Sequence, residues 1–209
     1  MNNMLIKICG IQKIDTLICC SSNNINFFGM IFYDKSPRNI KLEDALTLQS
    51  YAKKLNIKGV GVFVNEKIEI IKTLINKLSL EYIQIHGDED ENYIKDIKSL
   101  DVSIIKKISI KNSDDLKKIE KFPSSDYLLF DYSPKKNELP GGNARSFNWD
   151  IIKDLDIKKP WFLSGGINSS NIQYIRKKIN PFGVDLSSGV EKKLGIKDND
   201  IINNFIDQL

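Results

Sequence analysis

The sequence predicts an α/β protein that folds as a single (β/α)8 barrel, a TIM barrel, over residues 1–209. Eight short apolar runs alternate with longer stretches in which apolar residues recur three and four positions apart. Repeated strand-then-helix units give either a closed parallel barrel or a doubly wound sheet, and a count of eight favours the barrel. The length of 209 residues suits one domain with few insertions.

The expected strands are apolar runs that are long enough for a strand and too short for most helices. They recur at intervals along the whole chain, as a repeated strand–helix unit requires. In chain order they are Met4–Cys9, Asn26–Tyr33, Gly59–Val64, Tyr82–His86, Val102–Ile108, Tyr127–Asp131, Pro160–Leu163 and Gly183–Leu186.

The stretches between these strands have the spacing of amphipathic helices. The clearest are Leu42–Leu55 and Ile68–Leu78, whereas the first, about Lys13–Ser22, contains cysteines and serines, which form helices poorly. The polar segment from Ser133 to Ser146 is expected to form a loop over the barrel mouth. Weaker helical patterns cover Tyr93–Leu100, Asp114–Lys121, Trp149–Leu155, Ile172–Ile179 and Ile201–Leu209.

Composition excludes several classes of protein. With 41% hydrophobic residues, 28% charged residues and a net charge of +4, the chain is neither disordered nor a membrane protein, and no signal peptide is expected. Cys9, Cys19 and Cys20 lack a CxxC spacing, which argues against disulfides and zinc and favours a cytoplasmic setting. Lysine pairs are dispersed among acidic residues, as on an ordinary surface, so no nucleic-acid partner is expected.

In barrels of this kind the reacting groups lie at the carboxyl ends of the strands and in the loops that follow. Asp131 ends an otherwise apolar strand, where a carboxylate is costly unless it is satisfied or functional. The same rule places a thiol, a guanidinium, an imidazole and two carboxylates on one rim, those of Cys9, Arg38, His86, Asp131 and Asp185.

Each of these residues also has a structural interpretation. A cysteine at a strand end is usually a small buried hydrophobe, although Cys9 is also a catalytic candidate. Asp131 is equally suited to cap the turn that follows it, and His86 to be a satisfied structural histidine. Arg38 is compatible with the surface, but the preceding Ser36-Pro37 makes its loop rigid and aims its side chain.

Two loops carry glycines in a pattern that suits an anion. Gly165 and Gly166 follow the seventh strand and open a helix, and Ser187, Ser188 and Gly189 follow the eighth. Glycines let backbone N–H groups approach an anion closely, and barrels commonly bind a phosphate at these two loops. The alternative is that both segments are simply tight turns.

The order and spacing of eight short motifs resemble one family, the phosphoribosylanthranilate isomerases of tryptophan biosynthesis, which are (β/α)8 barrels. No single motif is decisive, but the set covers the chain from the first strand to residue 198. The motifs are Lys7–Gly10 (KICG), Phe32–Arg38 (FYDKSPR), Gly61–Asn65 (GVFVN), Ile83–Gly87 (IQIHG), Leu129–Asp131 (LFD), Gly141–Trp149 (GGNARSFNW), Leu163–Ile167 (LSGGI) and Val184–Glu191 (VDLSSGVE).

The resemblance implies an Amadori rearrangement of N-(5-phosphoribosyl)anthranilate to 1-(o-carboxyphenylamino)-1-deoxyribulose 5-phosphate, without metal or organic cofactor. By analogy, Asp131 is the general acid and Cys9 the general base. Arg38 would pair with the anthranilate carboxylate, His86 would line the same pocket, and Asp185 would lie near the ribose. The implied partner is a small phosphosugar, bound by a monomer rather than a dimer, with no role for a membrane.

The sequence departs from the family in the loop after the sixth strand. Asn143, Ala144, Arg145 and Ser146 stand where the family usually has Thr, Gly, Lys and Thr. The change from glycine to Ala144 is expected to lower loop flexibility, which bears on closure and turnover more than on the reaction itself.

Three other functions fit the barrel less well. Ribulose-phosphate epimerases need metal-binding histidines, and His86 is the only histidine of the chain. The related histidine-pathway isomerase uses paired aspartates, one of them where this chain has Cys9. A non-catalytic phosphate-ligand sensor is disfavoured because acid, base, carboxylate clamp and phosphate loops occur together.

Overall fold

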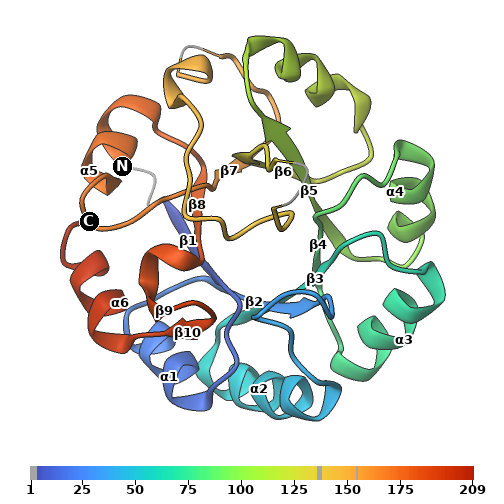
Figure 1. Cartoon of the computed structure of the whole chain (residues 1–209). Coiled ribbons are helices and arrows are strands. Elements are labelled where there is room, and N and C mark those ends of the chain that lie inside the picture. Colours follow the sequence, from blue (N-terminus) through green and yellow to red (C-terminus); the bar gives the residue numbers. More distant parts are fainter. Residues whose placement is uncertain (1–3, 136–137, 154) are drawn as a thin grey trace.

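Eight parallel strands form a closed barrel in sequence order in the computed structural model, which describes residues 4–135, 138–153 and 155–209. The last strand pairs with the first, and helices surround the barrel (Figure 1). The prediction of a (β/α)8 barrel is therefore confirmed. The strands are β1 Leu5–Cys9, β2 Phe27–Phe32, β3 Lys58–Phe63, β4 Tyr82–Ile85, β5 Ser103–Ile110, β6 Tyr127–Tyr132, β7 Trp161–Leu163 and β8 Gly183–Leu186.

The first four helices and the last one lie where the apolar spacing predicts them. Each presents a stripe of apolar side chains to the strands, and the weakest, α1, buries Leu17 and Cys20 in the same way. In the described ranges no helix combines the length and apolar character that crossing a lipid bilayer requires. These helices are α1 Ile14–Ser22, α2 Leu42–Leu55, α3 Ile68–Leu78, α4 Glu91–Lys98 and α6 Asn199–Ile206.

The other predicted helices are wrong in type or length. The predicted helix at Asp114–Lys121 is a 3-10 helix, η1 Ser113–Lys121, that buries none of its residues. The predicted Trp149–Leu155 helix is a single 3-10 turn, η2 Trp149–Ile151, and its predicted course crosses residue 154, outside the described residues. The Ile172–Ile179 segment is a short helix, α5 Ile172–Tyr174, continued by a π turn, η3 Ile175–Ile179.

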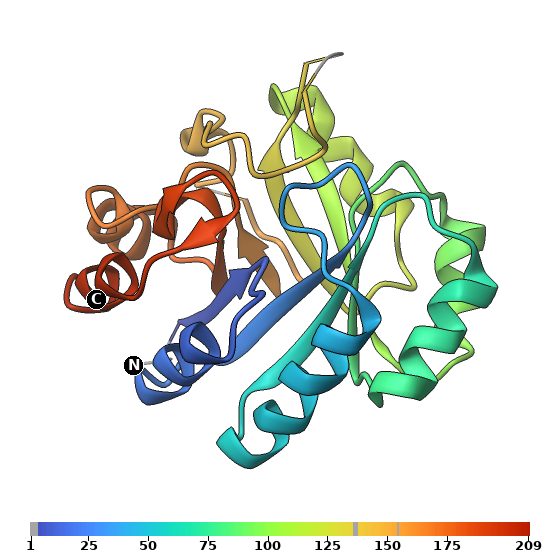
Figure 2. The same ribbon diagram turned by 60° about the horizontal axis from the view of Figure 1, so that its bottom comes forward.

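The carboxyl ends of the strands carry two features above the barrel. The segment after β6 and the loop after β2 both rise above this end (Figure 2). The sequence analysis predicts the first of these, the loop from Ser133 to Ser146. Residues 136–137 of that loop lie outside the described residues. After β8 come a 3-10 turn, η4 Ser188–Val190, and a small antiparallel hairpin that the sequence analysis missed, β9 Glu191–Lys193 and β10 Ile196–Lys197.

The core has two parts because successive strand residues point to opposite faces. The larger part lies between the strands and the helices. A smaller apolar layer fills the barrel interior, and polar residues take its place above it, towards the carboxyl ends of the strands. The interior apolar layer consists of Phe27, Val60, Ile105, Leu129 and Phe162.

Two neighbouring isoleucines of α3 test this packing. Ile71 is fully buried and Ile70 is 43% exposed. We expect Ile71→Ala to lower the free energy of unfolding by about 2–5 kcal/mol, because it leaves a cavity, and Ile70→Ala by less than about 1 kcal/mol. Urea unfolding of both variants measures the difference. Equal losses would show that α3 does not pack as described.

Candidate active site

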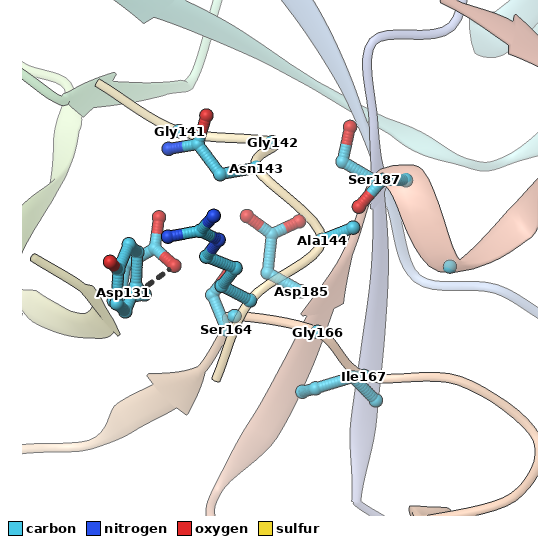
Figure 3. A pocket seen from close by; sticks show the side chains of 15 residues that line it. Asp131, Gly141, Gly142, Asn143, Ala144, Ser164, Gly166, Ile167, Asp185 and Ser187 are labelled. Carbon is cyan, nitrogen blue, oxygen red and sulfur yellow. Dashed lines mark hydrogen bonds between the residues drawn. The ribbon is translucent and has the colours of Figure 1, made fainter. Parts of the chain in front are cut away.

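All ten residues that the sequence analysis singled out line two adjoining cavities at the carboxyl ends of the strands. The apolar cavity, of about 540 Å³, has Ile31, Val62 and Pro140 in its wall. The glycine cavity, of about 350 Å³, is lined by the loops after β6, β7 and β8 (Figure 3). Cys9, Arg38 and His86 line the apolar cavity, Gly165, Gly166, Ser188 and Gly189 line the glycine cavity, and Asp131, Asp185 and Ser187 line both.

Asp131 is the last residue but one of β6, and its carboxyl group is buried between the two cavities. It accepts a hydrogen bond of 2.8 Å from the backbone N–H of Tyr132, and His86 Nε2 lies 3.6 Å from its Oδ2. Burial raises the pKa of Asp131 to about 6, against the effect of the Lys107 ammonium, which lowers it. This carboxyl group can therefore hold a proton close to neutral pH.

His86 is a neutral side chain that points its Nε2 at Asp131. Burial lowers its pKa well below the usual value, and the nearby lysines Lys107 and Lys7 lower it further. The Gln84 side-chain amide nitrogen lies 2.8 Å from Nδ1, and with this amide assignment Nδ1 accepts and Nε2 carries the proton. Gln84, which the sequence analysis missed, lies two residues before His86 on the same strand face.

Gln84 also offers an unused acceptor to the apolar cavity. Its Oε1 is buried and has no hydrogen-bond partner within the described part of the chain. Gln84 lines the apolar cavity, where a ligand could supply the missing donor.

Cys9 ends β1 as a buried thiol on the wall of the apolar cavity. A Cβ atom at position 29 would lie 2.7 Å from Sγ, so Gly29 leaves the room that the sulfur occupies. Burial raises the pKa of Cys9, and Lys7 opposes this effect; Asp185 raises the pKa further and Lys197 lowers it. The thiol is thus a weak acid whose anion depends on two neighbouring ammonium groups.

Lys7 forms a buried ion pair with Asp185 beneath the cavities. Its Nζ lies 3.0 Å from each carboxylate oxygen, and none of its side chain is exposed. Although burial alone would lower the pKa of Lys7, the Asp185 carboxylate and Cys9 raise it, so the ammonium keeps its charge. Lys7 was missed, but its position two residues before Cys9 was a usable signal.

Arg38 has a protein partner that the sequence analysis did not foresee. Its Nε and Nη2 donate to the two oxygens of Glu191, at 2.7 and 2.9 Å, and only 2% of the residue is exposed. Lys197 donates to the same carboxylate. Because Nε and Nη2 face Glu191, Nη1 is the nitrogen left for a ligand in the apolar cavity, which Arg38 lines beside Gly142.

The glycine cavity is built from backbone with left-handed conformations. Gly165 and Gly166 have φ of +90° and +70°, which glycine adopts without strain. The predicted helix directly after this pair is wrong, since α5 begins only at Ile172. Loop backbone, rather than a long helix, therefore lines this cavity. Ala144, from the loop after β6, lines it as well and has a φ of +55°.

The sequence matches the family model for N-(5'-phosphoribosyl)anthranilate isomerase over residues 6–208. The chain belongs to the phosphoribosylanthranilate isomerase family. Its members isomerise N-(5'-phosphoribosyl)anthranilate in tryptophan biosynthesis. Two isomerases of this family, from Thermoanaerobacter sp. and Aquifex aeolicus, are each 37% identical to it, over 98% and 96% of this chain and 97% and 96% of theirs.

Solved structures of phosphoribosylanthranilate isomerases agree with the fold. The isomerase from Thermotoga maritima superposes with a TM-score of 0.87 at 30% identity, covering 99% of this chain and 98% of that one. A further structure, with a TM-score of 0.85 at 30% identity and the same coverage, is a complex with reduced 1-(o-carboxyphenylamino)-1-deoxyribulose 5-phosphate. Another, with a TM-score of 0.84, describes monomers generated from the dimeric Thermotoga maritima isomerase.

Burial of Asp131 has a consequence for stability that depends on pH. Because the folded pKa of about 6 lies above the unfolded value of about 3.9, the contribution of the Asp131 carboxyl group to stability is fully present below pH 4 and is lost as the pH rises through 6. We therefore expect Asp131→Asn to be more stable than the wild type by about 3 kcal/mol above pH 7, and by little near pH 4.

Urea unfolding of both proteins between pH 4 and 8 measures this difference. The exposed Asp207→Asn variant is the control, because it changes the net charge equally without touching the site. A difference between Asp131→Asn and wild type that stays constant over this range would mean that the folded protein does not disfavour the Asp131 anion.

Proposed function

We propose that Cys9 and Asp131 carry out the isomerisation of N-(5'-phosphoribosyl)anthranilate as general base and general acid. The observation that supports this most is their placement: a thiol from β1 and a carboxyl group from β6 line one apolar cavity that opens into a glycine-lined one. A proton donor and a proton acceptor held on separate strands can act on two positions of one sugar without neutralising each other.

The proposed reaction has two proton transfers made by the enzyme, followed by a tautomerisation in which C1 gains a proton and the C2 hydroxyl loses one. Asp131 gives its proton to the ring oxygen of the furanose, the bond from that oxygen to C1 breaks, and the nitrogen lone pair forms a protonated Schiff base with C1. Cys9 thiolate then removes the proton from C2, which yields an enolamine that tautomerises to the ketone. The buried carboxyl group, with its pKa near 6, suits the first step because it can be protonated near neutral pH.

The two cavities divide the substrate between them. The apolar cavity takes the anthranilate ring, and Arg38 Nη1 binds its carboxylate. The glycine cavity takes the phosphate, through backbone N–H groups of the loops at Gly165-Gly166 and Ser187–Gly189. The ribose then lies at the shared wall, beside Asp185. His86 lines the anthranilate side, and its Nε2 lies 3.6 Å from Asp131 Oδ2.

The same assignment covers the setting of the enzyme. The ligand is a small phosphosugar, and the chain works in the cytoplasm as a monomer, without nucleic acid, metal or organic cofactor. One chain supplies every residue assigned above, so the proposed chemistry needs no second subunit. Size-exclusion chromatography with light scattering tests the oligomeric state, and a dimer would contradict this part.

Replacing either proton-transfer group tests the roles. Cys9→Ser puts a much weaker acid in place of the base, and Asp131→Asn cannot deliver a proton. We expect each to lower kcat by at least about a hundredfold, measured as the loss of phosphoribosylanthranilate fluorescence. Cys19→Ser, which changes a thiol on α1, is the control and should keep normal turnover. Near-normal kcat in Cys9→Ser would make Cys9 a packing residue.

Arg38 is tested with a variant that keeps its charge. In Arg38→Lys the ammonium still pairs with Glu191. It lacks the planar guanidinium that binds Glu191 and the anthranilate carboxylate at the same time. We expect KM to rise about tenfold or more, with a smaller change in kcat, because the lost contact is made to bound substrate. Lys35→Ala, an exposed charge in the same loop, should leave KM unchanged. An unaltered KM in Arg38→Lys would place the carboxylate site elsewhere.

A further inference from the structure

Two lysines with little or no exposure point into the barrel directly beneath the catalytic groups. Lys7 is paired in register with Phe27, and Lys107 with Leu129, both members of the interior apolar layer. Because residues paired across neighbouring strands share a face, both lysine side chains lie inside the barrel. They are 0% and 6% exposed, and the reaction as described above uses neither.

Lys7 lies next to the base. Cys9 is two residues further along β1 and therefore points into the barrel from the same face. The Lys7 ammonium binds both oxygens of Asp185 at 3.0 Å, and its charge lowers the pKa of the Cys9 thiol. When Cys9 gives up its proton, this ammonium is a positive charge already in place on the same face of the strand.

Lys107 lies next to the acid. Asp131 is two residues beyond Leu129 on β6, so it is the diagonal neighbour of Lys107 on the interior face. The only hydrogen bond of the Lys107 ammonium to the described residues runs to the Pro140 carbonyl, at a long 3.4 Å. Burial lowers its pKa, and of the charges around it Asp131 raises that pKa most. The Asp131 carboxylate is thus the charge that most stabilises the Lys107 ammonium.

We propose that Lys7 and Lys107 are positioning residues that fix the two proton-transfer roles separately: the charge of Lys7 stabilises the Cys9 anion, and the charge of Lys107 stabilises the Asp131 anion. The proposal rests on the functions assigned above to Cys9 and Asp131.

The remaining charges near each group leave this division intact. Cys9 faces Lys7 on β1, Asp185 on β8 and Lys197 on β10. Asp131 faces Lys107 on β5 and Asp185 on β8, and the neutral His86 after β4. Asp185 is common to both groups, but its charge is held by Lys7. Of the described charges that influence these two groups most, Lys107 is therefore the cation that acts on Asp131 and not on Cys9.

This arrangement predicts the shape of the pH profile. Asp131 titrates near 6, whereas burial keeps the pKa of Cys9 above its ordinary value, so the carboxyl group loses its proton before the thiol does. The reactive form, thiolate with protonated carboxyl, is then a minor species of constant fraction between the two pKa values. The acidic limb of kcat/KM belongs chiefly to Asp131 and the alkaline limb chiefly to Cys9.

Methionine variants separate the two lysines, because methionine keeps the length of the side chain and removes its charge. In Lys7→Met the alkaline limb should move up by about one pH unit or more, and the plateau should fall about tenfold or more, since less thiolate forms. In Lys107→Met the acidic limb should move up, and the plateau should hold or rise, because more Asp131 is protonated.

A second measurement follows the thiol without turnover. The rate at which iodoacetamide alkylates Cys9, taken as a function of pH with Cys9→Ser as the blank, reports the thiolate directly. Its midpoint should rise in Lys7→Met and stay unchanged in Lys107→Met. If Lys7→Met does not fold because Asp185 is left unpaired, Lys7→Met combined with Asp185→Asn removes both charges, and the midpoint should still rise.

The outcomes distinguish the proposal about the two lysines from the proposed roles of Cys9 and Asp131. Loss of activity in both variants with neither limb nor alkylation midpoint moved would overturn the proposal and make the lysines packing residues. Limbs that move together in each variant would also overturn it, since the two groups would then not be set separately. Normal kcat in Cys9→Ser would instead overturn the assigned roles, whatever the lysine variants do.

Discussion

The buried ion pair between Lys7 and Asp185 is the interaction on which the polar half of the barrel depends. Both side chains are almost fully inside, and both oxygens of the carboxylate are within 3.0 Å of the ammonium. Removing either partner would leave a buried charge without compensation, which costs about 3–5 kcal/mol. Because Asp185 lines both cavities, the pair fixes their common floor as well as the charge next to Cys9.

The apolar layer beneath this pair is what makes the charges effective. Phe27, Leu129 and Phe162 fill the barrel interior beneath the polar residues, and Cys9 and Asp131 above them are themselves buried. Desolvation is accordingly the first cause of the raised pKa of Asp131 and of Cys9. Burial helps the acid, because Asp131 keeps its proton to higher pH, and hinders the base, because less Cys9 thiolate forms. The base therefore depends on the cation on β1, Lys7, whereas the cation on β5, Lys107, acts on the acid and limits how far burial raises its pKa.

Local sequence patterns sufficed for the barrel and for the residues at its rim. Apolar runs end at Cys9, Asp131 and near Asp185, and the parallel barrel brings these ends together. Pairings between distant residues could not be predicted: Lys7 and Asp185 are 178 positions apart, and Arg38 and Glu191 are 153 apart. The helix predicted after β6 was wrong because tertiary packing overrides a short apolar pattern.

The loop after β6 has an unfavourable backbone conformation and a close contact where it borders the site. Gly141 passes so close to His86 that a Cβ atom would lie 2.5 Å from Nε2, which only glycine avoids. Ala144, in the same loop, has a φ of +55°, where an alanine is less favourable than glycine by about 1 kcal/mol. The strain lies in the part of the backbone that lines the glycine cavity, where Ala144 contacts the space proposed for the phosphate.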